Sequence, residues 1–445
     1  MRKKQFSLGV TIALMALTAA LTLTLTYQYA MNRFNQQVKN VTERQKMYAK
    51  LYQIDTKTRG QFLFDIDENK LNDAIANGYV EGLDDANSQY LPQSECAQLQ
   101  QQLAGTQVGI GAEFAVNEQG EARISRLIDG APAAIAGIQK NDCIVAVNGQ
   151  DVTDWTEAQI AAAISGDTGT EVVLTIARQS ENGELAEQNF TLTRRSYNLV
   201  TVESRIIDDV IGYIRIYSFN ENTDTEFQEI LNSLTNAGVA GIVIDVRNNG
   251  GGTLESAANI LDLLLPAGNI VYSADATGKK TVLYTSDAAQ NTLPLAVLIN
   301  GNSASASELI AAAVQDYERG TVVGAQSAGK GTLQQLYTFT DGSGLSLTTA
   351  YFYPPLSAGF NQTGVTPDVR VELAYTGSLD LLPAESDTQL NAAVSKLKQT
   401  IGLEPTEGEE GETTDPTESE DAPDTPSTTS STLAMQSGCE DASRI

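Results

Sequence analysis

The order of apolar and polar positions divides the chain into stretches with different periodicity. No charged residue occurs from Gln5 to Asn32, and three basic residues precede this stretch. From 33 to about 104 the apolar positions recur at helical spacing. Short β-like runs interrupted by helical stretches occupy 106 to 196, and from 211 onward strands and helices alternate. Such alternation is typical of an α/β domain with partly parallel strands.

This pattern predicts an α/β (α+β) multidomain protein with five regions. They are a cytoplasmic stub and transmembrane signal-anchor at 1–32, a helical region at 33–104, a small β-rich domain at 105–196, an α/β core with a C-terminal helix at 197–400 and an acidic tail at 401–445.

Individual elements follow from the same pattern. Helices are expected at 38–51, 69–83 and 94–103, and the first strand of the β-rich domain at 108–114. Further strands of that domain are expected at 122–127, 143–147, 172–177 and 190–194, with helical stretches at 131–137 and 156–164. In the core the expected strands are 211–219, 242–246, 295–299 and 321–324, and the expected helices 223–237, 254–264 and 305–317.

The uncharged N-terminal stretch sets the expected compartment. About 20 apolar residues cross a bilayer, and the basic flank stays in the cytoplasm, so the rest of the chain is expected outside the cytoplasm. A cleaved signal peptide is the alternative. Its apolar region would be shorter and would end in an Ala-x-Ala-like site, and no clean site of that kind follows Ala19 and Ala20.

The charge balance narrows the classes of partner. The chain has 56 acidic and 28 basic residues, a net charge of −28 that argues against nucleic acid as a partner. The segment 404–445 alone has twelve acidic residues and one arginine, so we expect a solvated, disordered tail. Cys96, Cys143 and Cys439 are too few and too scattered for a disulfide framework or a thiolate metal site. No metal and no cofactor are expected.

The chain contains no histidine. This excludes Ser-His-Asp and Cys-His catalysis and histidine-ligated zinc. Acid-base chemistry must therefore use a carboxylate, a lysine, a cysteine or a tyrosine.

One candidate chemical segment follows the apolar strand expected at 295–299. It runs from Asn302 to Glu308 and contains three serines. Ser305 with Glu308 fits a capping box, which would make the serine a structural helix cap. A serine on a tight strand-to-helix turn is also where a nucleophile is exposed, with free N–H groups aimed at developing negative charge. The spacing alone leaves both interpretations open.

A second segment, 324–332, resembles a phosphate-binding P-loop but departs from it. That motif needs Ser or Thr directly after the lysine, and here Gly331 follows Lys330. A P-loop also leads into a helix, whereas Thr332 to Thr340 alternates like a strand. A nucleotide site is therefore the weaker interpretation.

The β-rich domain resembles a PDZ domain of the bacterial, protease-associated type. The resemblance rests on Val108-Gly109-Ile110-Gly111, on the stretch 130–138 and on the stretch 141–149. A Gly-x-Gly loop before a strand lets backbone N–H groups converge on a carboxylate, and the exposed strand edge can accept a peptide. We expect the loop Val108, Gly109, Ile110 and Gly111 to bind peptide.

The chain from about 211 to 370 resembles the C-terminal processing (tail-specific) serine peptidases, which have a PDZ domain ahead of a Ser-Lys core. The resemblance rests on the segment 302–308, on Gly329-Lys330-Gly331 with Gln334, and on the glycine-rich segment 245–252. It implies the following roles: nucleophile for Ser305, base for Lys330, orientation of the lysine for Gln334, and an oxyanion hole at Gly251 and the N–H of Ala306.

The same resemblance implies that the PDZ domain recognises protein or peptide substrates with apolar C-terminal ends. A lysine can act as base only when desolvated or near positive charge, because an ordinary lysine has a pKa of about 10.4. Asp245 and Arg247 are interpreted as a structural ion pair. A PDZ adaptor with an inactive core and, more remotely, a P-loop protein remain alternatives, and self-association into a homo-oligomer is left open.

Overall fold

The computed structural model describes residues 8–38, 41–117, 119–179, 185–375 and 377–403. The N-terminal basic stub and all but the first residues of the predicted acidic tail lie outside these ranges. The chain divides into two compact units, Met1–Asp84 and Asp85–Ile445. Each unit is described by itself.

The first unit consists of helices α1 (Leu8–Val38), α2 (Val41–Gln61) and α3 (Glu68–Glu81). Asp67 caps α3 by accepting a hydrogen bond from the Lys70 N–H at 3.1 Å. Within the described residues, α1 contains one window, Ile12–Met31, that is long and apolar enough to cross a membrane, with a mean hydropathy of 1.3.

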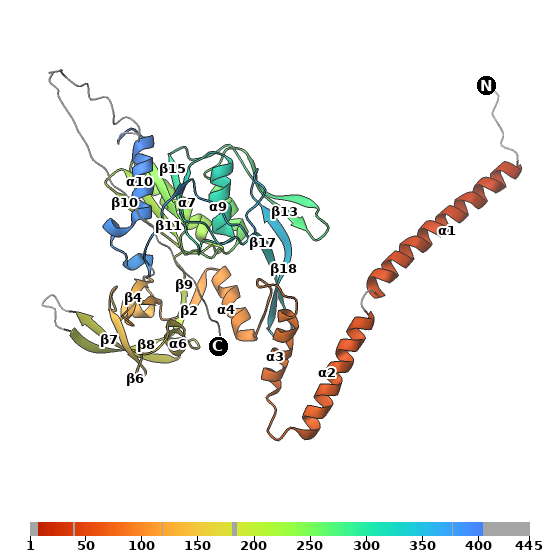
Figure 1. The fold of residues 1–445 in the computed structure, drawn as a ribbon, viewed down its shortest axis with the longest axis horizontal. Coiled ribbons are helices and arrows are strands. Elements are labelled where there is room, and N and C mark those ends of the chain that lie inside the picture. The colour runs from red at the N-terminus through yellow and green to blue at the C-terminus, as the bar shows by residue number, and fades with distance from the viewer. Residues whose placement is uncertain (1–7, 39–40, 118, 180–184, 376, 404–445) are drawn as a thin grey trace, which may run out of the picture. The chain divides into compact units, whose positions relative to one another are not determined.

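The β-rich domain of the second unit is built on one antiparallel sheet (Figure 1). Its strands, in spatial order, are β3 (Ala112–Val116), β4 (Ala122–Leu127), β5 (Cys143–Val147), β7 (Glu171–Gln179) and β8 (Leu185–Thr193), with β6 (Gln150–Asp151) on β5. Two helices, α5 (Pro132–Ile135) and α6 (Glu157–Ile164), complete the domain. An apolar core that includes Ile124, Leu174 and Ile160 joins the sheet to α6.

The strand predicted over 108–114 is in fact two strands. β2 (Thr106–Gly109) pairs with β9 (Arg195–Asn198) in a separate two-stranded sheet, and β3 begins only at Ala112. The break lies at Gly111, whose φ is +70°; an added β-carbon there would lie 2.1 Å from Ala131 Cβ. This turn requires a glycine, because a side chain would collide with Ala131. The turn separates β2, in the two-stranded sheet, from β3, in the main sheet of the domain.

The core of the second unit is a six-stranded sheet covered on both faces. The strand order is β10 (Val202–Ile207), β11 (Ile211–Ile216), β12 (Gly241–Asp245), β15 (Leu295–Ile299), β16 (Thr321–Gly324) and β19 (Val369–Arg370). The pairs from β11 to β19 are parallel, as the strand-helix rhythm predicted. One face packs against α7 (Thr223–Asn236), α8 (Leu254–Asp262) and α9 (Ala306–Asp316). The other packs against α10 (Thr388–Thr400), which lies opposite α9 in Figure 1.

A second sheet supports the segment that follows Lys330. It consists of β1 (Gln89–Leu91), β18 (Gly344–Tyr353), β13 (Gly268–Asp275), β14 (Lys280–Ser286) and β17 (Thr332–Thr338), which pairs with β18. Helix α4 (Gln93–Leu103) follows β1, and two short 3₁₀ turns, η1 (Leu379–Leu381) and η2 (Ala384–Ser386), precede α10. The residues after Lys330 form the predicted strand, where a P-loop would continue as a helix.

Candidate active site

The turn that carries Ser305 lies between the carboxyl end of β15 and the start of α9. Ser305 has a φ of +56°, a conformation that costs a residue with a side chain roughly 1–3 kcal/mol and occurs most often at functional sites. Its N–H donates to Glu308 Oε2 at 2.8 Å, the backward half of the predicted capping box. The Ser305 side chain is half-buried. Ser305 is therefore both the N-cap residue of α9 and a partly exposed residue on a strand-to-helix turn, so both interpretations offered by the sequence apply to it.

The glycine-rich loop after β12 approaches this turn closely. Gly251 has a φ of +105°, and an added β-carbon would lie 2.9 Å from Ser305 Cβ and 3.3 Å from the Ala306 nitrogen. The absence of a side chain at Gly251 therefore leaves open the space directly beside the Ser305 side chain and the Ala306 N–H. The predicted role of Ser305 as nucleophile would place the attacked carbonyl in this region.

Asn249 holds the glycine loop and the serine turn together. Its backbone oxygen accepts from the Ala304 N–H at 3.0 Å and from the Ser307 hydroxyl at 2.8 Å. Its side-chain oxygen accepts from the Gly251 N–H at 2.9 Å, and its amide donates to the Ile216 oxygen at the same distance. The Gly251 donor is thus engaged, and a substrate oxygen would have to exchange with the Asn249 oxygen to reach it.

The loop that carries Lys330 is tied to the same turn through its backbone. The Ala328 N–H donates to the Ser303 oxygen at 3.0 Å, and the Gly331 N–H donates to Asn361 Oδ1, also at 3.0 Å. The Lys330 side chain is half-buried rather than enclosed. Among the described residues no hydrogen bond joins its ammonium to the Ser305 hydroxyl. The structure therefore brings together the main-chain segments that bear the two residues, and bonds between catalytic groups commonly tighten only on substrate binding.

Glu308 is the carboxylate that joins the two loops. It is fully buried on α9 and accepts four hydrogen bonds. Two come from Ser327 Oγ and the Gly329 N–H at 2.6 Å each, and two come from the N–H groups of Ser305 and Lys330 at 2.8 Å each. One carboxylate thus fixes the main chain on both sides of the candidate dyad.

Replacing Glu308 by glutamine is expected to disturb this arrangement. A glutamine has one carbonyl oxygen and an NH₂ group, so it cannot accept from donors on both sides, and buried donors would lose their partners at about 1–3 kcal/mol each. We expect kcat/KM for peptide hydrolysis to fall roughly 10- to 100-fold. Glu229→Gln, on the exposed side of α7, is the matched control. Unchanged activity in Glu308→Gln would show that the carboxylate does not position the two loops.

Gln334 lies on β17, four residues after Lys330. Its amide nitrogen donates to Thr332 Oγ1 at 2.9 Å and to Thr348 Oγ1 at 3.1 Å. In the described structure Gln334 is therefore held by threonines of its own sheet, and a contact with Lys330 would have to involve its carbonyl oxygen.

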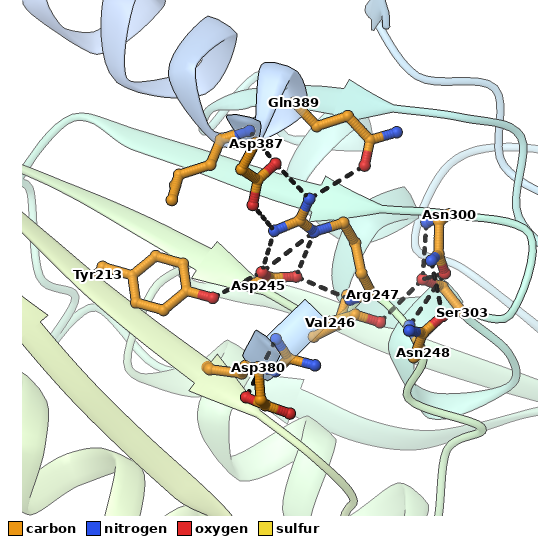
Figure 2. A network of polar contacts seen from close by, with 12 residues as sticks. Tyr213, Asp245, Val246, Arg247, Asn248, Asn300, Ser303, Asp380, Asp387 and Gln389 are labelled. Carbon is orange, nitrogen blue, oxygen red and sulfur yellow. Dashed lines mark hydrogen bonds and ion pairs between the residues drawn. The ribbon is translucent and has the colours of Figure 1, made fainter. Parts of the chain in front are cut away.

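Asp245 and Arg247 form a buried network at the carboxyl end of β12 (Figure 2). All five guanidinium N–H donors of Arg247 can be assigned to Asp245, Asp387 and Gln389, at 2.7 to 3.1 Å. Burial alone would raise the pKa of Asp245, but the charge and hydrogen bonds of Arg247 outweigh it and lower that pKa to about 2. The network fits the structural role predicted for the pair, because its atoms are fully engaged with one another.

The predicted peptide loop, 108–111, covers the end of β2 and the break before β3. Val108 and Gly109 belong to β2, whereas Ile110 is buried in the core of the domain and its oxygen accepts from the Ala133 N–H at 2.8 Å. The Gly111 oxygen accepts from the Ile128 N–H at 2.9 Å. The loop therefore leads directly into β3, the edge strand of the sheet.

Two partners of the site have no clear signal in the sequence. Asp387 lies 140 residues from Arg247, and only its place ahead of a helix marks it as a cap. Glu308 is visible as a capping residue, but its bonds to the Lys330 loop depend on a loop 21 residues further along the chain. Sequence spacing cannot show which of several acids closes such a contact.

Comparisons with known proteins agree with this fold. The model of the Peptidase family S41 matches residues 210–371, and a PDZ domain model matches 123–178. The chain is 33% identical over 320 residues to the carboxyl-terminal-processing protease of Synechocystis sp., covering 71% of this chain and 74% of the relative. It is 32% identical over 343 residues to the carboxy-terminal processing protease CtpA of Bacillus subtilis, covering 76% and 72%. A solved S41 protease structure from Bacteroides fragilis, 18% identical, matches its fold with a TM-score of 0.52 over 77% of this chain and 93% of that one.

A PDZ domain next to an α/β core that matches the Peptidase family S41 model defines a PDZ-containing serine peptidase. The chain belongs to Peptidase family S41, among its C-terminal processing proteases.

Proposed function

We propose that this protein is an extracytoplasmic, membrane-anchored serine endopeptidase. Its PDZ domain binds the apolar C-terminal ends of protein substrates, and its core cleaves peptide bonds with a Ser305-Lys330 dyad. The observation that supports this most strongly is the convergence of Ser305, Gly251 and the Lys330 loop, joined by Glu308. Labelling of Ser305 by a fluorophosphonate probe tests the proposal, because it requires an activated serine.

The proposed reaction proceeds through an acyl-enzyme. The neutral amine of Lys330 takes the proton of the Ser305 hydroxyl as the oxygen attacks the peptide carbonyl. The negative charge that develops on the carbonyl oxygen is held by the N–H groups of Ala306 and Gly251, after the Gly251 donor exchanges its bond to Asn249. The protonated lysine then gives its proton to the leaving amine, and water hydrolyses the acyl-enzyme.

Gln334 is proposed to orient Lys330 through its carbonyl oxygen. Its amide nitrogen is already bound to two threonines, which fixes the plane of the carboxamide. A fixed acceptor would hold the lysine in one rotamer and reduce the entropy lost on reaching the reactive geometry.

The edge strand β3 and the loop before it support the proposed role of the PDZ domain. An edge strand presents unpaired backbone groups, and an extended peptide can bind there as an added strand. The substrate's terminal carboxylate would lie at the loop Val108–Gly111.

The proposed anchor predicts how the protein fractionates. With α1 spanning the bilayer, the full-length chain should stay in the membrane pellet after an alkaline carbonate wash, and a variant without residues 1–32 should be released. External protease should digest the core in intact spheroplasts. A mature chain whose N-terminal sequence begins after α1 would replace the anchor by a cleaved signal peptide.

A further inference from the structure

A groove of about 500 Å³ lies along β3 and the start of α6 in the PDZ domain. The residues of β3 form one side, and Glu157 and Ala161 of α6 form part of the other. Ser125 of β4 and, from the segment before η1, Gly377 and Ser378 complete the lining. Among the described residues β3 has a strand on one side only, so its outer edge can accept an added strand once the Val116 N–H exchanges its bond to Glu157. Ala112, Ala115 and Ala161 are small, which leaves room for the side chains of a bound peptide.

Two acidic residues, Glu113 and Glu157, line this groove, and among the described residues Glu157 is the one without an ion pair. It is the first residue of α6, and the Thr156 N–H bonds Gln159 Oε1 at 2.8 Å in a capping box that fixes this helix end. Its carboxylate is exposed and accepts a hydrogen bond from the Val116 N–H at 3.4 Å. Within the described residues it has no ion pair, whereas Glu113, the other acid of the groove, is bound by Arg126 at 3.0 Å.

The position of Glu157 along β3 selects one place in a bound peptide. Val116 follows Gly111 by five residues, and both strands of an antiparallel pair advance about 3.4 Å per residue. A peptide whose carboxylate lies at the Gly111 loop, with its last residue opposite Ala112, therefore places the residue four positions before its last opposite Val116. Glu157 reaches that residue or the next one towards the C-terminus, which is three positions before the last.

We propose that Glu157 makes this groove selective for substrates with a lysine or arginine three or four positions before their C-terminal residue. The inference rests on the proposed function, because it takes the groove to receive the substrate's C-terminal end. The surrounding charge favours the same cations: region 105–196 has 13 acidic and 6 basic residues, a net charge of −7.

The test measures binding of fluorescent ten-residue peptides to the full-length protein in detergent, with Ser305→Ala to prevent cleavage. The peptides share an apolar, free C-terminus, and one lysine or one glutamate is moved through each of the six positions before the last. Tightest binding is expected with lysine three or four positions before the last residue, about two- to fivefold tighter than with glutamate there. This difference should shrink at about 0.5 M NaCl. Glu157→Gln should remove the preference and Glu157→Lys should reverse it, while Glu187→Gln, on the opposite edge strand β8, should leave it intact.

The possible outcomes separate this inference from the proposed function. If amidation of the C-terminus abolishes binding but lysine and glutamate bind equally at every position, the peptide site stands and the role of Glu157 is wrong. A preference that persists in Glu157→Gln also overturns that role. If amidated and free peptides bind equally, or none binds, the proposed C-terminal recognition fails and this inference fails with it. Reversal by Glu157→Lys excludes misfolding as the cause, because a misfolded domain would lose binding for both peptides.

Discussion

Replacing Ser305 or Lys330 by alanine is expected to abolish cleavage of a chemically unfolded reporter protein that ends in apolar residues. Each change removes one member of a pair that acts in the same step, so each should lower kcat by on the order of 10⁴-fold or more. The double variant should be no slower than either single one, because the dyad works as a unit. Lys330→Arg should also be inactive, since a guanidinium keeps its proton.

Matched controls separate this loss from unfolding. The controls are Ser357→Ala and Lys279→Ala, which change an exposed serine and an exposed lysine elsewhere in the peptidase domain. Both control variants should cleave the reporter at the normal rate. All variants should keep the far-UV circular dichroism and melting temperature of the unmodified protein, because the side chains of Ser305 and Lys330 are only half-buried. Fluorophosphonate labelling should disappear in both alanine variants. Cleavage at the normal rate by either variant would refute the dyad, and an unmodified chain that neither labels nor cleaves would support the alternative of a PDZ adaptor with an inactive core.

The sequence predicted the parts of this protein that depend on local pattern. The alternation from 211 onward predicted a parallel sheet with helices on its faces, and strand β17 after Lys330 was expected because Thr332 to Thr340 alternates. The absence of histidine limited the possible bases, and the family resemblance assigned one to Lys330. These inferences use neighbours along the chain, where periodicity and motif spacing carry the information.

Long-range contacts of the site could not be predicted in the same way. Glu308 fits a local capping box, and only the folded chain shows that it also binds the Lys330 loop. Gly251 is one of three consecutive glycines, and its close approach to Ser305 distinguishes it in the structure, since Gly252 also has a positive φ. The single strand predicted over 108–114 was wrong because the chain turns at Gly111 with a positive φ, close against Ala131, which separates β2 from β3.

Replacing Arg247 by alanine is expected to cause the largest loss of stability. The Arg247 side chain is 1% exposed and lies between Asp245 and Asp387, whose side chains are 0% and 9% exposed. Removing one partner of a buried ion pair leaves uncompensated buried charge and costs about 3–5 kcal/mol of unfolding free energy. Arg370→Ala, which breaks an ion pair with Glu372 at an exposed arginine, is the matched control and should cost at most about 1 kcal/mol. Denaturant unfolding of both variants measures the difference.

The pH dependence of this loss identifies its cause. In the unmodified protein the pKa of Asp245 is about 2, below its ordinary value of 3.8, so its contribution to stability is present above pH 3.8 and is lost as the pH falls towards 2. In Arg247→Ala the burial of Asp245 is opposed only by the more distant charge of Arg215 and the Tyr213 hydroxyl, so the pKa of Asp245 rises and protonation at mildly acidic pH relieves the buried charge. The stability difference between the two proteins should therefore be greatest near neutral pH and narrow steadily below about pH 5. A difference that is constant with pH would instead mean that Arg247 stabilises the core by packing and not through its charge.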